Sequence, residues 1–74
     1  MEYKQYQLTI ALKELLEQKN MTRYALAEAT QRQFKTIDRY YKNKLVKLDG
    51  ELLLRICVEL DCNIEDILKI EKIT

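Results

Sequence analysis

The sequence contains no histidine, no tryptophan, no proline and only one glycine among its 74 residues. Without histidine the chain lacks the commonest general base and the commonest imidazole metal ligand, so we expect neither an enzyme nor a bound metal or other cofactor. With no proline and one glycine, few residues interrupt a helix. The composition therefore favours an all-α fold.

Long apolar runs are also missing. No stretch of about 18 apolar residues is present, so we expect no contact with a membrane. The N-terminal residues, MEYKQYQLTI, lack the basic start and the apolar stretch of a secretory signal, which favours a cytoplasmic protein. A chain of 74 residues is expected to form one domain, residues 1–74, without an enclosed cavity for a small-molecule ligand.

The two cysteines, Cys57 and Cys62, could form a disulfide, contribute to a metal site or remain free. A zinc site usually needs four ligands, and the chain supplies no histidine and no further cysteine. In a chain that we expect to be intracellular, buried free thiols are the favoured interpretation.

Apolar residues recur at helical spacing in five segments. These are residues 7–19, residues 23–30, residues 33–42, a segment that begins after Asp49 and a short segment that begins after Asn63. Thr22, Asp49 and Asn63 are suitable N-caps, Asp66 completes an approximate capping box with Asn63, and Asn20 is a suitable left-handed stop. The C-terminal residues, LKIEKIT, alternate imperfectly and are compatible with a short extended tail.

The net charge of +1 conceals a strong charge separation. Residues 23–48 carry a net charge of +5, and residues 49–66 carry −5. One face of the molecule is therefore expected to attract polyanions. Charge alone leaves open the simpler interpretation of ordinary solvated helix surface.

Residues 22–42 combine a short capped helix, a turn of a few residues and a second helix with basic and polar residues. The major groove of B-form DNA is about 12 Å wide and admits one α-helix, while a preceding helix can bridge the backbone and hold the reading helix in place. Ala27 would provide the small side chain that two closely crossing helices need at their contact. Residues 22–42 are therefore a candidate DNA-reading unit.

The sequence LAEATQRQFKTIDRYYKNK, preceded by KNMTRYA and followed by LLLRICVELDCNIEDIL, resembles the phage-repressor and Cro type of helix-turn-helix, the XRE family. The resemblance covers residues 8–69. It implies a compact five-helix domain with a scaffold helix at about 23–30 and a recognition helix at about 33–42. It also implies a sequence-specific DNA-binding transcriptional regulator that inserts its third helix into the major groove of a double-stranded operator as a homodimer.

The resemblance also implies two sets of DNA contacts. The residues expected to contact base edges are Gln33, Phe34, Lys35 and Arg39. The residues expected to contact phosphates are Thr22, Arg23, Arg32, Thr36, Lys42, Asn43 and Lys44. The chemistry agrees, because Arg and Lys can bind guanine, Gln can pair with adenine and Phe can contact a thymine methyl group. Phe34 can equally belong to the core, and Asp38 is placed to pair with Lys42 four residues later.

The sequence departs from the family pattern at the turn and in the core. Gln31 stands where the family usually has glycine, at a cost on the order of 1 kcal/mol if the left-handed geometry is retained. Arg32 replaces the customary apolar turn residue. Leu16 and Tyr41 occupy positions where many relatives pair Arg with Glu, and we interpret them as a matched apolar substitution.

Two classes of function remain after these arguments. The first is a transcriptional regulator that occupies an operator and performs no chemistry. The alternative is a protein-binding module of the same fold, such as an antitoxin-like or anti-repressor partner, in which the basic face meets an acidic protein.

Overall fold

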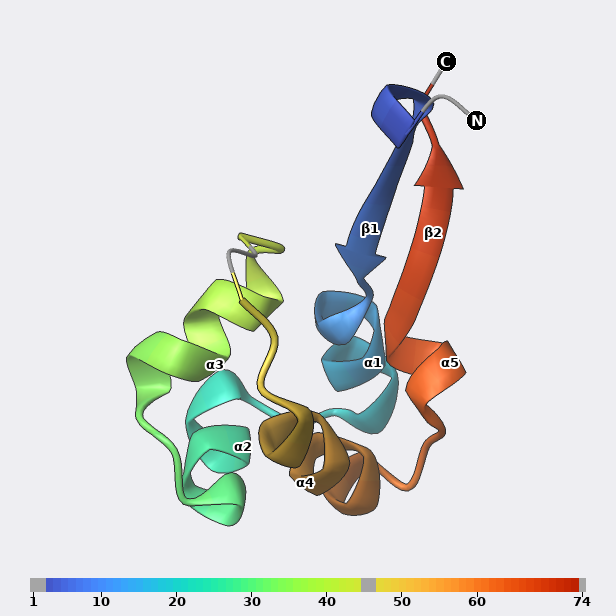
Figure 1. Ribbon diagram of the computed structural model, residues 1–74. Helices are drawn as coiled ribbons and strands as arrows, with labels where there is room; N and C mark the ends of the chain where they lie inside the picture. The colour runs from blue at the N-terminus through green and yellow to red at the C-terminus, as the bar shows by residue number, and fades with distance from the viewer. Residues whose placement is uncertain (1–2, 45–46, 74) are drawn as a thin grey trace.

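The structure is a computed structural model that describes residues 3–44 and 47–73 (Figure 1). Within these residues there are five α-helices and two short strands. The elements are η1 (Tyr3–Gln5, a 3-10 turn), β1 (Tyr6–Ile10), α1 (Leu12–Lys19), α2 (Arg23–Thr30), α3 (Phe34–Tyr41), α4 (Gly50–Leu60), α5 (Ile64–Ile67) and β2 (Leu68–Lys72). None of the described helices has the length and apolar character needed to cross a membrane.

The strands correct the expectation of an all-α fold. We predicted a helix over residues 7–19, but residues 7–10 belong to β1, and helix α1 starts only at Leu12. Residues 6–10 pair antiparallel with residues 72–68 and form a two-stranded ribbon. The prediction was wrong because Tyr6, Leu8 and Ile10 fit strand alternation, and their partner strand lies some 60 residues further along the chain. The expectation of an extended C-terminal segment is confirmed by β2.

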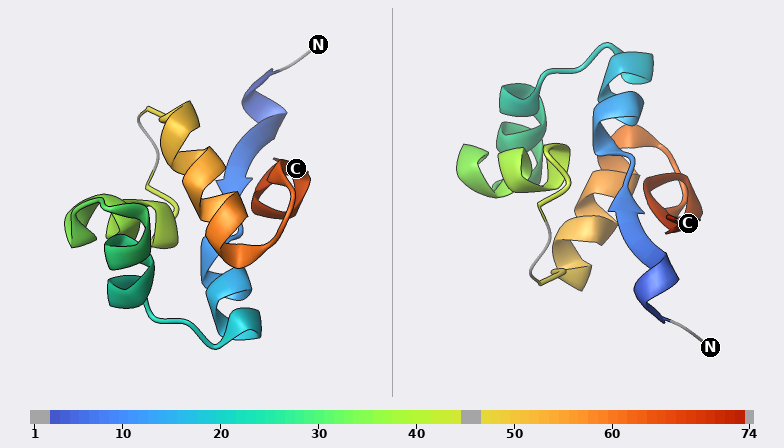
Figure 2. Two further views of the ribbon diagram at one scale, coloured as in Figure 1. Left: turned by 90° about the horizontal axis from the view of Figure 1, so that it is seen from below. Right: turned by 90° about the horizontal axis from the view of Figure 1, so that it is seen from above.

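The core lies where the five helices meet. Its side chains are nearly all aliphatic, and the exposed fraction of each is 7% or less. They are Ile10, Leu12, Leu15, Leu16, Leu26, Ala27, Ile37, Tyr40, Leu52, Leu53, Ile56, Leu60 and Ile67. Figure 2 shows the resulting arrangement, in which α1 and α4 separate the α2–α3 pair from the ribbon and α5. One side of the molecule therefore carries the helix-turn-helix, and the other carries the ribbon.

The helix ends follow the predicted capping residues. The Thr22 hydroxyl accepts the Ala25 N–H at 3.0 Å, and Asp49 accepts the Glu51 N–H at 3.0 Å. The capping box of Asn63 and Asp66 is present before α5. These caps satisfy N–H groups that have no partner inside the helix.

Cys57 and Cys62 are free thiols, as expected, but both are half-buried rather than fully buried. The Cys62 N–H donates to the Cys57 carbonyl oxygen at 3.0 Å, in the turn that ends α4. Burial and the neighbouring Cys57 raise the pKa of the Cys62 thiol to about 11. The Cys62 sulfur is therefore held in its protonated, weakly nucleophilic form.

Candidate nucleic-acid interface

Helices α2 and α3 pack directly against each other through small and aliphatic side chains. Leu26 and Ile37 are fully buried, and Ala27 is 6% exposed. Because a methyl group is all that Ala27 contributes, the two backbones can approach closely. This packing fixes the angle between the axes of α2 and α3.

The turn between the two helices retains the left-handed geometry of a glycine-containing turn. Gln31 ends α2 with φ 58° and ψ 41°. Its N–H donates to the Glu28 carbonyl at 3.2 Å, and the next N–H, that of Arg32, donates to the Ala27 carbonyl at 3.0 Å. Gln31 thus adopts a conformation that costs a residue with a Cβ about 1 to 2 kcal/mol.

Arg32 and Arg55 tie this turn to α4. The half-buried Arg32 forms an ion pair with the α4 N-cap, Asp49, at 3.2 Å. Arg55 donates to the carbonyl of the buried Thr30 at 2.8 Å and to Glu51 at 3.1 Å. Sequence reasoning missed Arg55, for which the only local signal is Glu51 four residues earlier. The backbone carbonyl at the end of α2 is thereby satisfied.

The outward side of α3 carries polar and basic side chains. Ile37 and Tyr40 face the core, whereas Gln33, Lys35 and Arg39 are exposed. Within the described parts of the chain, neither Lys35 nor Arg39 forms an ion pair. Because four residues separate Lys35 from Arg39, the two cations share one face of the helix. The outward side of α3 is therefore a cationic and polar surface.

Phe34 is half-buried at the start of α3 and packs against α2. Its ring stacks on that of Tyr24, with 4.1 Å between the ring centroids and an angle of 15° between the planes. The Arg23 guanidinium lies 5.5 Å from the centre of the same ring. Tyr24, which sequence reasoning did not single out, is 70% exposed and lies beside the outward side of α3.

An ion-pair network joins the start of α2 to the end of α3. Asp38 pairs with Arg23 and, as its spacing predicted, with Lys42 at 3.0 Å. Hydrogen bonding and charge from Lys42 and Arg23 lower the pKa of the Asp38 carboxyl below its usual value, against a smaller opposing effect of desolvation. Arg23 also lies 4.3 Å from the centre of the Tyr41 ring, which packs against the core. Tyr41 therefore serves as a platform for a cation.

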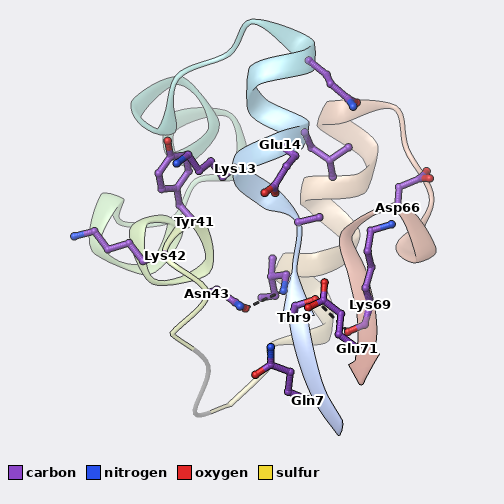
Figure 3. Close-up of a pocket in the computed structure, with 14 residues that line it drawn as sticks. Gln7, Thr9, Lys13, Glu14, Tyr41, Lys42, Asn43, Asp66, Lys69 and Glu71 are labelled. Atoms are coloured by element: carbon purple, nitrogen blue, oxygen red, sulfur yellow. Dashed lines mark hydrogen bonds between the residues drawn. The ribbon is translucent and has the colours of Figure 1, made fainter. Parts of the chain in front are cut away.

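The remaining predicted phosphate contacts lie at three places along the helix-turn-helix. Thr22 is exposed at the N-terminus of α2, and Thr36 is half-buried on α3. Lys44 is exposed just beyond α3, where its N–H donates to the Arg39 carbonyl at 3.0 Å. The Asn43 side chain has an internal role, because its Oδ1 accepts the Ile10 N–H at 2.8 Å, as Figure 3 shows.

Comparisons with known proteins agree with this geometry. A search of curated proteins found no match. Two solved structures share the fold. One is a candidate DNA-binding protein from Bacteroides fragilis, with a TM-score of 0.77 and 22% identity over 85% of this chain and 100% of that chain. The other is the transcriptional regulator VanUg, with a TM-score of 0.74 and 25% identity over 97% of this chain and 95% of that chain.

A family profile matches most of the chain. It describes the Cro/C1-type helix-turn-helix DNA-binding domain and matches residues 11–72, a range that includes α2, the turn and α3. The protein therefore belongs to the family of Cro/C1-type helix-turn-helix DNA-binding domains.

Proposed function

We propose that the protein is a sequence-specific transcriptional regulator that inserts α3 into the major groove of a double-stranded DNA operator. The observation that carries this proposal is the division of α3 into two sides. Ile37 and Tyr40 anchor it in the core, and Gln33, Lys35 and Arg39 extend outward without ion-pair partners in the described residues. A rigidly seated helix with free polar groups is suited to reading base edges.

The proposed base contacts follow from the chemistry of each side chain. Arg39 can donate two hydrogen bonds to guanine O6 and N7, and Lys35 can reach the same acceptors. Gln33 can pair with adenine, and the exposed edge of Phe34 can contact a thymine methyl group while its face stacks on Tyr24. Each good bidentate pair is expected to discriminate by about 1 to 3 kcal/mol.

The proposed phosphate contacts flank this reading surface. They are Thr22, Arg23, Arg32, Thr36, Lys42, Asn43 and Lys44. Three of them, Arg23, Arg32 and Lys42, form partly exposed internal ion pairs. Such pairs typically contribute less than about 1 kcal/mol. A phosphate can therefore take the place of the carboxylate beside the cation, or bind the same cation together with it, at little cost in free energy. Asn43 would use its amide NH₂, since its oxygen is already an acceptor.

We propose further that the protein acts as a homodimer on two half-sites about 34 Å apart. It would regulate by occupancy, blocking or recruiting polymerase, and would perform no chemistry.

The proposal is tested in two steps. Selection of bound fragments from genomic DNA first identifies an operator. Titration of that duplex with the protein at several salt concentrations should then give a plot of the logarithm of the binding constant against the logarithm of the salt concentration. Its slope should be about −5, the value expected for about six phosphate contacts. A duplex of scrambled sequence is the matched control and should bind more weakly by about a thousandfold or more. A protein that shows no saturable duplex binding at modest salt, and instead retains an acidic protein partner, would refute the proposal.

A further inference from the structure

The turn that ends α4 has a cysteine on each side. Cys57 lies in the last turn of α4, Cys62 follows Asp61, and the chain contains no other cysteine. Asp61 is in the left-handed conformation, with φ 51° and ψ 54°. The chain reverses there, and the Cys62 N–H donates to the Cys57 carbonyl at 3.0 Å. This is the Schellman arrangement, in which the residues at the two ends of the turn come into contact.

The hydrogen bond limits the distance between the two Cα atoms. In standard covalent geometry each Cα lies within about 2.4 Å of the bonded atom of its own residue. A bond of 3.0 Å therefore keeps the Cα atoms of Cys57 and Cys62 less than about 7 Å apart. Disulfides join Cα atoms that are about 4.4 to 6.8 Å apart. The backbone of this turn is consequently already within the range that a disulfide can bridge.

The two thiols are also close to each other and can be reached from solvent. After burial, charge and hydrogen-bonding interactions with Cys57 are the main causes that raise the pKa of Cys62, and such interactions require neighbouring sulfur atoms. Both cysteines line one open groove, together with Leu54, Val58 and Ile64. Neither cysteine is fully buried. A small reagent in the groove can therefore approach the pair.

The other helix ends show that packing of this turn needs no thiol. Helices α1, α2 and α3 end with an equivalent N–H to C=O bond of 3.0 Å. The residue pairs that correspond to the two cysteines are Leu16 and Met21, Ala27 and Arg32, and Arg39 and Lys44. An apolar contact is common at these positions, and the first pair provides one without sulfhydryl groups. A contact between two small apolar side chains therefore does not account for two thiols at the end of α4.

We propose that Cys57 and Cys62 are a site of reversible oxidation, at which a low-molecular-weight disulfide closes an intramolecular disulfide between α4 and α5. The Cys57 thiolate attacks one sulfur of the reagent, whose S–S bond breaks and releases one thiolate. The Cys62 thiolate then attacks the Cys57 sulfur of the mixed disulfide, forms the Cys57–Cys62 bond and displaces the second thiolate. The protein thiols lose two protons and two electrons, and the reagent takes up both and leaves as two thiols.

The environment of the pair determines the order of these steps. Because the pKa of Cys62 is raised to about 11, Cys57 is the thiol that attacks first. Attachment of the reagent removes the charge of Cys57, and with it one cause of the raised pKa of Cys62. Since the chain has no third cysteine, Cys62 is the only thiol of the same chain that can resolve the mixed disulfide.

The bridge would hold the connection between α4 and α5 in its folded form. Figure 1 shows that α5 continues directly into β2, and the carbonyl of the buried Ile67 accepts the Ala11 N–H at 2.8 Å. None of the residues proposed to contact DNA belongs to this turn. Oxidation is therefore expected to stabilise the fold without changing the reading surface, and the proposal does not depend on the proposed function.

Equilibration of the full chain with reduced and oxidised glutathione, without DNA, tests the proposal. By linkage, the factor by which folding favours the bridge equals the factor by which the bridge favours folding. At the same glutathione ratio, the ratio of bridged to reduced chain should be at least about tenfold higher in buffer than in urea. Mass spectrometry after alkylation of the remaining thiols measures this ratio. The bridged chain should also have a Tm at least about 5 °C higher than the reduced chain.

Three variants provide the controls. Cys62→Ser should stop at the mixed disulfide with glutathione on Cys57, and Cys57→Ser should form its mixed disulfide more slowly. The double variant Glu51→Cys/Cys57→Ser retains two thiols but moves one of them about 9 Å back along the helix axis, so it should form no bridge within the folded chain.

The proposal is overturned if the folded chain forms the bridge no more readily than the unfolded chain, or if the bridged chain has a lower Tm. It is also overturned if the disulfide joins two chains, or if Glu51→Cys/Cys57→Ser forms the bridge as readily as the original chain. If a variant fails to fold, the glutathione equilibrium of the original chain decides. A chain that forms the bridge but binds no operator refutes the proposed function and leaves this site standing.

Discussion

Replacing Gln31 with glycine is expected to stabilise the protein. Gln31 has φ 58° and ψ 41° at the end of α2, and its side chain is exposed. Glycine removes the Cβ that makes this conformation unfavourable, and the substitution removes no buried contact. Both backbone hydrogen bonds of the turn remain available to glycine.

The size of the effect follows from two opposing quantities. The left-handed conformation costs about 1 to 2 kcal/mol for a residue with a Cβ, and glycine gives back part of this through its larger freedom in the unfolded chain. The free energy of unfolding of Gln31→Gly should therefore rise by about 1 kcal/mol. For a domain of this size such a gain raises the Tm by about 4 to 8 °C. Urea unfolding and thermal denaturation, followed by circular dichroism, measure both quantities.

Two further variants show whether backbone conformation is the cause. Gln31→Ala retains the Cβ, so no comparable gain is expected. Asn20 ends α1 in the same conformation, with φ 53°. Because asparagine tolerates this region, Asn20→Gly should gain only a few tenths of a kcal/mol. If Gln31→Gly is no more stable than Gln31→Ala, the strain assigned to this turn does not exist.

Four further predictions concern the reading unit and the titrating groups. Arg39→Ala should remove about 1 to 3 kcal/mol of preference at one base pair. Lys44→Ala should instead weaken binding to all duplexes alike and reduce the slope of log K against log salt by about 1. Measurements of operator affinity for both variants distinguish these two effects. Because the folded-state pKa of Asp38 is lowered, its contribution is present above the ordinary value near 3.8 and lost as the pH falls through the folded pKa. Urea unfolding below about pH 4 should therefore show a shallower loss of stability in Asp38→Asn than in the original chain, and equal slopes would contradict this. In Asn43→Gly, the glycine tolerates the backbone φ of 59° at this position but cannot accept the hydrogen bond from the Ile10 N–H. The free energy of unfolding should therefore fall by about 1 kcal/mol. An unchanged value would mean that this bond contributes nothing to stability. With a pKa of about 11 rather than 9.0, Cys62 has about a hundredfold less thiolate at pH 8 when folded than in urea, so it should react more slowly with an aromatic disulfide when folded, and equal rates would contradict the assigned burial.

The helix-turn-helix could be predicted because its signals are local. The Thr22 hydroxyl caps α2 by accepting the N–H of Ala25, only three residues later in the chain. The apolar residues that define α2 and α3 also lie within a few helical turns of one another. The separation of α3 into a buried and an exposed side follows from the same periodicity. The candidate base contacts could therefore be placed on the outward side from the sequence, although contact with DNA stays a prediction.

The ribbon and the cross-helix contacts could not be predicted in the same way. The segment that includes Leu8 fits both a helical and an alternating pattern, and the choice depends on a strand near the other end of the chain. The bond from Arg55 to the Thr30 carbonyl likewise depends on how α4 crosses α2. Pairing of Arg23 with Asp38 joins residues on two helices. Local periodicity carries no information about these relative orientations.

The hydrogen bond from the Ile10 N–H to Asn43 makes the end of α3 and the base of the ribbon neighbours in one mechanical unit. A duplex that shifts the end of α3 would stretch this bond at the base of the ribbon. By thermodynamic linkage, if DNA binding weakens or strengthens this bond, then loss of the bond changes the affinity for DNA by the same factor. The ribbon and the reading helix would then be coupled through one asparagine side chain.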